Sequence, residues 1–139
     1  MISRKVLVTP TVLFAFTDRN HPRHSEASAF FRYFAQEKFH VFVTSFSIAK
    51  TYDQIKKHTS FSIAKDFLRI IYTGNIEIVY PDEVVTKAAL KLLLTNTGVD
   101  LGLEHALINV IADRKQISQI AAFEYNNFYF GIQQFSLPY

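Results

Sequence analysis

The chain contains no cysteine, and this absence excludes three kinds of protein at once. A disulfide-stapled domain, a thiolate metal site and a cysteine nucleophile all require that residue. The chain also lacks a long apolar run: residues 88–94, among the longest, are broken by lysine and are far too short to cross a bilayer. The N-terminus has no apolar core or small-residue cleavage site of a signal peptide, so we expect a cytoplasmic protein without a membrane partner.

Hydrophobic residues, by contrast, are abundant. They make up 49% of the 139 positions and include 14 Phe and 7 Tyr, which excludes a disordered chain. A sequence of this length can bury one core and is too short for two ordinary ones, so we expect a single domain over residues 1–139. The formal net charge of +3 is compatible with an anionic partner but does not require one.

Short apolar segments alternate with segments of helical periodicity along the chain. Strands are expected at residues 6–8, 41–43, 76–79, 117–123 and, as a short fifth strand, 131–135. Between them, apolar residues at helical spacing predict helices that begin near residues 12, 24, 45, 60, 83 and 101. This alternation predicts an α/β protein with a mainly parallel central sheet of four or five short strands. Ligands of such sheets gather beyond the carboxyl ends of the strands.

The heptapeptide TSFSIAK occurs twice, at residues 44–50 and 59–65. In each copy a Thr or Ser can cap the free N–H groups of a helix that continues with apolar spacing. The interval between the copies is too short for a solenoid, whose units are 20–50 residues long. We therefore interpret the repeat as a shared way of starting two helices.

Five further segments follow one another in an informative order. They are TPTVL at residues 9–13, DRNHPRHSEASAFF at 18–31, VFVTSFSIAKTY at 41–52, LGLEHA at 101–106 and AFE at 122–124. This order and spacing resembles the PIN-domain family, whose small members include the bacterial VapC toxin endoribonucleases. The resemblance covers almost the whole chain and implies a PIN-like α/β/α sandwich.

The family carries four acidic residues, and the resemblance assigns each to a station in this chain. Thr9 stands where the family has its first Asp, Lys50 where it has Glu, His105 where it has its second Asp, and Glu124 where it has its last Asp. Family nucleases use Mg²⁺ or Mn²⁺, hard cations that prefer carboxylate oxygens. Because only one of the four stations keeps a carboxylate, the resemblance implies that the chain binds no metal cofactor. If a metal ion does bind, the resemblance implies that Glu124 is its ligand.

Lys50 is the most consequential of these replacements, because an ammonium group repels a divalent cation. We hypothesise that Lys50 pairs with Glu124 and replaces the metal as the electrostatic tie. Glu104 is adjacent to His105, but neighbouring helical residues point about 100° apart. We therefore expect Glu104 to be only a first-turn acid favoured by the helix dipole.

These replacements predict a PIN-like protein that has lost metal-dependent nuclease activity and serves as an RNA-binding, protein-binding or dimerising module. The first alternative is an active Mg²⁺- or Mn²⁺-dependent endoribonuclease of the VapC type with relocated acids, and the second is a decoy subunit that dimerises with an active relative. Expected partners are a second copy of the chain, RNA and an antitoxin-like protein. Candidate nucleic-acid contacts are Lys50, Lys57, Lys65 and Arg69. The aromatic tail, with Tyr125, Phe128, Tyr129 and Phe130, is expected at a subunit interface.

Overall fold

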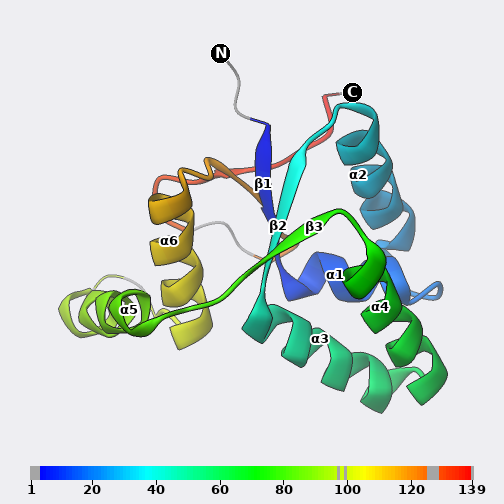
Figure 1. Cartoon of the computed structure of the whole chain (residues 1–139), viewed down its shortest axis with the longest axis horizontal. Coiled ribbons are helices and arrows are strands. Elements are labelled where there is room, and N and C mark those ends of the chain that lie inside the picture. The colour runs from blue at the N-terminus through cyan, green and yellow to red at the C-terminus, as the bar shows by residue number, and fades with distance from the viewer. Residues whose placement is uncertain (1–3, 97, 99, 125–128, 139) are drawn as a thin grey trace.

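The structure, a computed structural model, describes residues 4–96, 98, 100–124 and 129–138. The five strands and six helices of these ranges follow one another in the order β1 (Lys5–Val8), α1 (Pro10–Thr17), α2 (His24–Gln36), β2 (His40–Thr44), α3 (Ser45–His58), α4 (Phe61–Thr73), β3 (Ile76–Val79), α5 (Glu83–Thr95), α6 (Leu103–Lys115), β4 (Gln119–Ala121) and β5 (Gln133–Gln134). The strands form one sheet in the order β3-β2-β1-β4-β5 (Figure 1). Every pairing is parallel, so the α/β prediction is confirmed and the sheet is wholly parallel.

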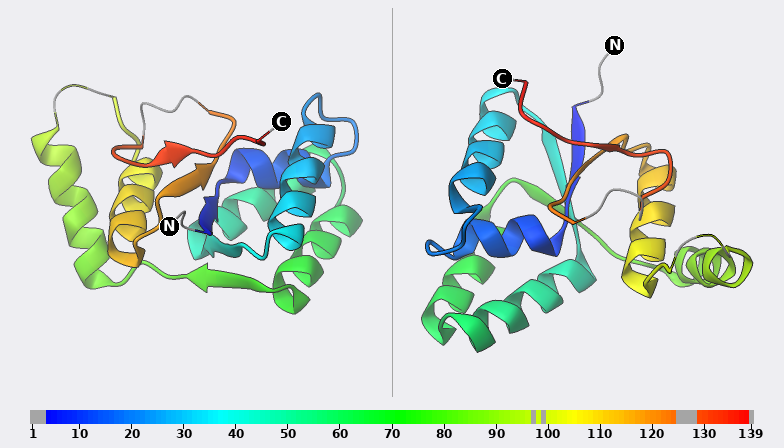
Figure 2. Two further views of the ribbon diagram at one scale, coloured as in Figure 1. Left: turned by 90° about the horizontal axis from the view of Figure 1, so that it is seen from above. Right: turned by 180° about the vertical axis from the view of Figure 1, so that it is seen from behind.

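The central strand, β1, shows why these apolar segments form a buried sheet. Val6, Leu7 and Val8 have no exposed surface, because helices cover both faces of a parallel sheet. Val6 and Val8 pack with the cluster formed by α1 to α4, whereas Leu7 packs on the other face with Ile108 and Ile111 of α6. Figure 2 shows α1 to α4 on one side of the sheet and α6, with α5 outside it, on the other.

The carboxyl end of β1 leads directly into a helix. Proline has no N–H to donate, and it fits the first turn of a helix, where N–H groups have no partner within the helix. Accordingly α1 begins at Pro10, two residues before the predicted start, and Thr9 is the residue that precedes it. Thr9 is therefore the single residue between the end of β1 and the start of α1.

Two strands are shorter than predicted. β4 covers only Gln119–Ala121, and β5 is a two-residue strand. Beyond β4 a side chain continues the pairing, since Gln134 donates its amide to the carbonyl of Ala122 at 2.7 Å. Two residues further on lies Glu124, whose carboxylate accepts the hydroxyl of Thr11 from the start of α1. None of the described helices is long and apolar enough to span a membrane.

The two TSFSIAK copies begin their helices with different residues. In the first copy the hydroxyl of Thr44 accepts the N–H of Ser47 at 3.1 Å, so α3 begins at the second residue of the phrase. In the second copy the hydroxyl of Ser60 accepts the N–H of Ile63 at 3.1 Å, so α4 begins one residue later. The prediction that the phrase starts two helices is confirmed, with a shift of one residue between the copies.

This shift gives a test with built-in controls. Thr44→Ala and Ser60→Ala each remove an N-cap, and each should lower the free energy of unfolding by about 1–2 kcal/mol. Thr59→Ala and Ser45→Ala change the equivalent residue of the other copy and should cost less than about 0.5 kcal/mol. Urea denaturation measures all four variants. Equal losses within each pair would contradict the assignment of the caps.

Candidate functional site

The residues at the first and last stations meet at the carboxyl ends of β1 and β4. Thr9 is completely buried, and its N–H donates to the carbonyl of Ala121 at 3.1 Å. Its hydroxyl donates to the same carbonyl at 3.2 Å and lies 3.0 Å from the hydroxyl of Thr11. The first station therefore holds a small side chain whose polar groups are already paired inside the protein.

Glu124 is held by two hydroxyl groups. The hydroxyl of Thr11 donates to Oε2 of Glu124, and the same oxygen of Thr11 accepts the N–H of Phe123 at 3.0 Å. Tyr129 donates its hydroxyl to Oε1 at 2.7 Å. Both carboxylate oxygens thus accept hydrogen bonds from neighbouring side chains, one from α1 and one from the segment that leads into β5.

The hydroxyl of Tyr129 is a persistent donor. Burial raises its pKa far above the ordinary value, and the charge and hydrogen bond of Glu124 raise it further. The side chain is only 4% exposed and packs in the core between the sheet and α6. The expectation that Tyr129 lies at a subunit interface is therefore wrong. Tyr125 and Phe128, named with it, lie outside the described residues.

Lys50 forms an ion pair, but its partner is Glu104 and not Glu124. Nζ of Lys50 lies 3.0 Å from Oε2 of Glu104, with side chains 50% and 25% exposed respectively. Our hypothesis of a Lys50–Glu124 pair is wrong, because two hydroxyls already hold Glu124 and the Glu104 side chain reaches across to α3. Glu104 does lie in the first turn of α6, but the expectation that it is only a first-turn acid is wrong, because it pairs with Lys50. Its charge also contributes to the raised pKa of Tyr129, which places it in the same region.

His105 lies against the same tyrosine. The two rings meet edge to face, with centroids 5.6 Å apart. The carbonyl of His105 accepts the side-chain amide of Asn109 at 2.8 Å, and Asn109 in turn accepts the N–H of Phe130 at 2.7 Å. At Gly102, just before α6, a Cβ would lie 3.2 Å from Nδ1 of His105, so glycine permits this close approach.

The structure thus connects all four stations. Thr9 reaches Glu124 through Thr11, Glu124 reaches the residue at the third station through Tyr129, and Lys50 joins the same region through Glu104. Sequence reasoning missed Thr11 and Tyr129 as members of the site. Thr11 stands in the quoted TPTVL segment, but nothing in the sequence indicates that Tyr129 turns inward while Phe130 stays 42% exposed.

The residues of the site do not fit a divalent metal ion. Mg²⁺ requires oxygen ligands in near-octahedral geometry, usually one or two carboxylates with several waters. Here both oxygens of Glu124 accept hydrogen bonds from hydroxyl groups, and Glu104 forms an ion pair with the ammonium group of Lys50. In the part of the chain that the structure describes, no group of three His, Cys, Asp or Glu side chains could hold a metal.

The candidate nucleic-acid contacts divide into two groups. Lys50 is paired with Glu104, and Arg69 is paired with Asp66 at 2.6 Å. Lys57 and Lys65 are exposed and form no ion pair with any residue that the structure describes. Of these four residues, Lys57 and Lys65 are therefore the ones whose charge is not compensated by a described carboxylate and is available to an external phosphate.

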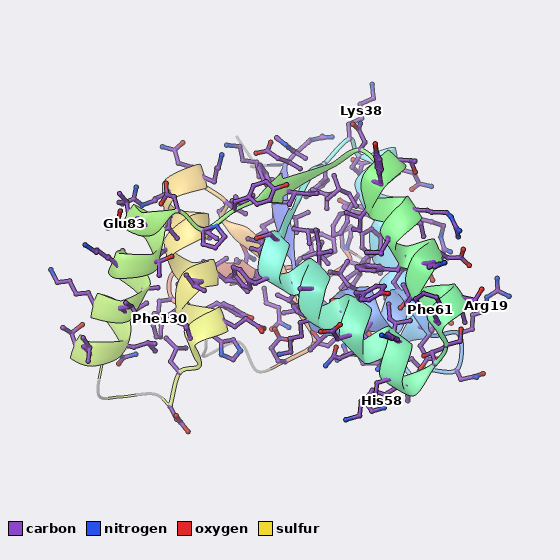
Figure 3. The ribbon with its side chains drawn as sticks, turned by 60° about the horizontal axis from the view of Figure 1, so that its bottom comes forward. Arg19, Lys38, His58, Phe61, Glu83 and Phe130 are labelled. Atoms are coloured by element: carbon purple, nitrogen blue, oxygen red, sulfur yellow. The ribbon has the colours of Figure 1, made fainter. Side chains whose placement is uncertain are left out.

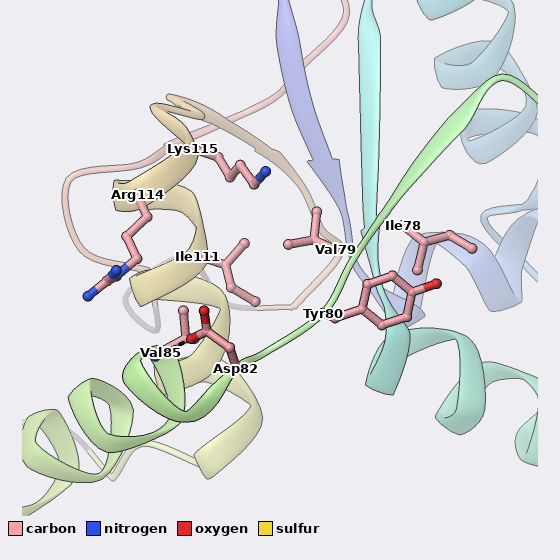
Figure 4. A pocket seen from close by; sticks show the side chains of 8 residues that line it. All are labelled: Ile78, Val79, Tyr80, Asp82, Val85, Ile111, Arg114 and Lys115. Carbon is pink, nitrogen blue, oxygen red and sulfur yellow. Dashed lines mark hydrogen bonds between the residues drawn. The ribbon is translucent and has the colours of Figure 1, made fainter.

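A separate pocket of about 320 Å³ lies between β3, α5 and α6 (Figure 4). None of the four stations lines it. Its one carboxylate, Asp82, caps α5 by accepting the N–H of Val85 at 2.8 Å, and its cations, Arg114 and Lys115, come from the end of α6. This pocket is therefore distinct from the candidate site.

The tie between Tyr129 and Glu124 is open to direct measurement. Tyr129→Phe should lower the free energy of unfolding by about 1.5–3 kcal/mol near pH 8, since hydrogen bonds to charged groups contribute about that much. A raised folded pKa stabilises the protein fully below the unfolded value of about 10, and this stabilisation is lost as pH rises above it. Urea denaturation should therefore show the difference from wild type shrinking between pH 8 and pH 10.5. Tyr72→Phe is the control, because that ring is 81% exposed; it should change neither the free energy of unfolding nor its dependence on pH.

The chain, with a parallel sheet covered by helices on both faces, has a PIN-like fold. It is similar to the structure of VapC20 from Mycobacterium tuberculosis, a toxin that cleaves the sarcin–ricin loop, with a TM-score of 0.77, 14% sequence identity and coverage of 91% of this chain and 98% of that one. It is also similar to VapBC2 from Rickettsia felis, solved with a DNA fragment from the promoter of these proteins, with a TM-score of 0.71, 14% identity and coverage of 94% and 96%.

No family model matches the sequence. No curated protein matches it either. At 14% identity the likeness to the two solved structures concerns the fold alone. The PIN-like fold implied by the sequence resemblance is therefore confirmed, whereas the chemistry of this chain has to be argued from its own residues.

Proposed function

We propose that this chain is a PIN-like protein without metal-dependent nuclease activity, which acts as a binding module for RNA or protein. The ion pair between Lys50 and Glu104 carries this proposal. Lys50 is half exposed and the pair contributes little to stability, but it places a positive charge beside the carboxylate, and this charge repels a divalent cation. A divalent cation near Glu104 would have to displace an ammonium group that is already neutralising the same carboxylate.

Glu124 supports the proposal independently. Each oxygen of Glu124 already accepts one hydrogen bond, from Thr11 or from Tyr129, so the carboxylate is held without a cation. The raised pKa of Tyr129 keeps its proton on the phenol, so this donor is not withdrawn near neutral pH. The carboxylate therefore has neutral donors in place of a cation, which supports a site that works without a metal.

The alternative is an active Mg²⁺- or Mn²⁺-dependent endoribonuclease that uses relocated acids. One observation favours it: Glu104 and Glu124 both act on Tyr129, so two carboxylates lie in one region. This alternative requires Lys50 to leave Glu104 when the metal binds. The two functions therefore differ in whether Lys50 opposes metal binding.

A cleavage assay with purified protein, mixed RNAs and Mg²⁺ or Mn²⁺ tests the proposal. We expect no cleavage and no saturable heat when either metal is titrated by calorimetry. The variant carrying Thr9→Asp, Lys50→Glu and His105→Asp should bind Mn²⁺ at least about tenfold more tightly, because it gains carboxylates and loses a repelling charge.

Because Thr9 is buried, the triple variant can fail to fold, so Lys50→Glu alone serves as the second test. Circular dichroism verifies the fold of both variants. Cleavage by the wild-type protein that requires the metal and disappears in Glu124→Gln would establish the nuclease and refute the proposal.

The same proposal includes protein partners. The likeness to VapBC2 supports an antitoxin-like partner for this chain, and the exposed apolar residues of the α5–α6 hairpin, Leu90, Leu94 and Leu103, support a homodimer. Because Leu94 is 85% exposed, Leu94→Glu should convert a dimer to a monomer in analytical ultracentrifugation without lowering the free energy of unfolding. Tyr72→Glu on α4, also strongly exposed, is the control and should leave the mass unchanged.

A further inference from the structure

Basic side chains surround the turn that joins α3 to α4. Lys56, Lys57 and His58 form the last turn of α3, and Lys65 follows in the second turn of α4. Among the residues that the structure describes, no carboxylate lies within ion-pair distance of any of the three lysines. The charge of these lysines is therefore available to an external anion.

An aromatic ring stands between the lysines. Phe61 begins α4 and is 51% exposed, although it is one of the most apolar residues of the chain. Nζ of Lys65 lies 4.6 Å from the centre of its ring, and Nζ of Lys56 lies 6.0 Å from the same point. The ring is thus an exposed aromatic surface with cations beside it.

The turn is fixed to the rest of the fold. The ring of His58 packs against Phe14 of α1, with centroids 6.3 Å apart, and Phe14 also contacts His21 in the loop after α1 at 6.0 Å. Figure 3 shows Phe61 and His58 toward the end of the molecule where Arg19, from the same loop, also projects. Aromatic contacts with α1 therefore hold the turn in position.

An exposed ring among unpaired lysines matches the chemistry of a single strand of nucleic acid. Ammonium groups attract the phosphates, and the ring offers a face on which an unpaired base can stack. The ammonium groups of Lys56 and Lys65 lie within reach of the Phe61 ring, and these favour an anionic ligand. A duplex offers phosphates but keeps its bases stacked on one another.

We infer that Lys56, Lys57, Phe61 and Lys65, here called the lysine–phenylalanine platform, bind single-stranded nucleic acid. The inference rests on the proposed function, because it gives the binding module a ligand and a surface. The platform keeps Lys57 and Lys65 of the contacts that the sequence suggested and adds two residues.

Fluorescence anisotropy with labelled twelve-nucleotide oligo(A), as RNA and as DNA, tests the charge of the platform. The variant Lys56→Gln, Lys57→Gln, Lys65→Gln should bind at least tenfold more weakly at low salt. Its plot of log affinity against log salt should be less steep by about 2, since each contact to a single strand contributes about 0.7. The control changes Lys38, Lys87 and Lys91 to Gln, which removes the same charge elsewhere and should alter binding much less. Equal losses in both variants would overturn the inference.

Phe61→Leu tests the ring. It should weaken binding about fivefold or more, because stacking on one base contributes about that much, and it should leave the salt dependence unchanged. Phe61→Tyr should retain binding, and Tyr72→Leu, at the other end of α4, is the control. No effect of Phe61→Leu, or equally tight binding of an RNA duplex, would overturn the inference. If the wild-type protein binds neither oligonucleotide, the inference is also overturned. That result would not decide whether the chain lacks metal-dependent nuclease activity, because the metal titration and the cleavage assay test that separately. The tighter of the two oligonucleotides identifies RNA or DNA as the ligand.

Discussion

The hydrogen bonds that Thr11 and Tyr129 donate to Glu124 are the interaction on which the site depends. Hydrogen bonds from hydroxyl groups to a carboxylate are charge-assisted and are stronger than those between neutral groups. The donor Thr11 lies 113 residues before Glu124 in the sequence, whereas the donor Tyr129 lies only five residues after it. The arrangement joins the start of α1 to the segment that enters β5, so the carboxylate that remains at the last station is also a cross-link between two ends of the chain.

This cross-link changes the electrostatics of the whole edge of the sheet. In a pocket of several carboxylates that share one cation, each acid depends on the same metal ion. In this chain each acid is compensated separately, Glu124 by hydroxyl groups and Glu104 by Lys50. Lys50 is half exposed, so its pair with Glu104 contributes little to stability, and its main consequence is the positive charge that it places beside that carboxylate. Within the described residues, the charges of these two acids are therefore compensated by groups of the protein itself.

The sequence predicted the elements of the fold well because their signals are local. Apolar triplets became strands and the TSFSIAK phrase started two helices, one capped by Thr44 and the other by Ser60. The ends of β4 and β5 were overestimated, because pairing partners and not composition decide where a strand ends. The region of Thr9 and Glu124 could be located, since these residues follow two strands that are neighbours in the sheet. The pairings of the site could not be predicted, because the partner of Lys50 lies 54 residues away and depends on the direction of a long side chain.

The same distinction between paired and unpaired cations separates the two copies of TSFSIAK. The final lysine of the first copy, Lys50, faces α6 and pairs with Glu104. The final lysine of the second copy, Lys65, lies over the ring of Phe61 on the surface of α4. Identical phrases therefore place identical residues in different surroundings, because α3 follows β2 directly whereas α4 follows the turn at the end of α3. The ammonium group of Lys50 is paired within the candidate site. The ammonium group of Lys65 forms no ion pair with a described residue and is available to a ligand near the turn between α3 and α4.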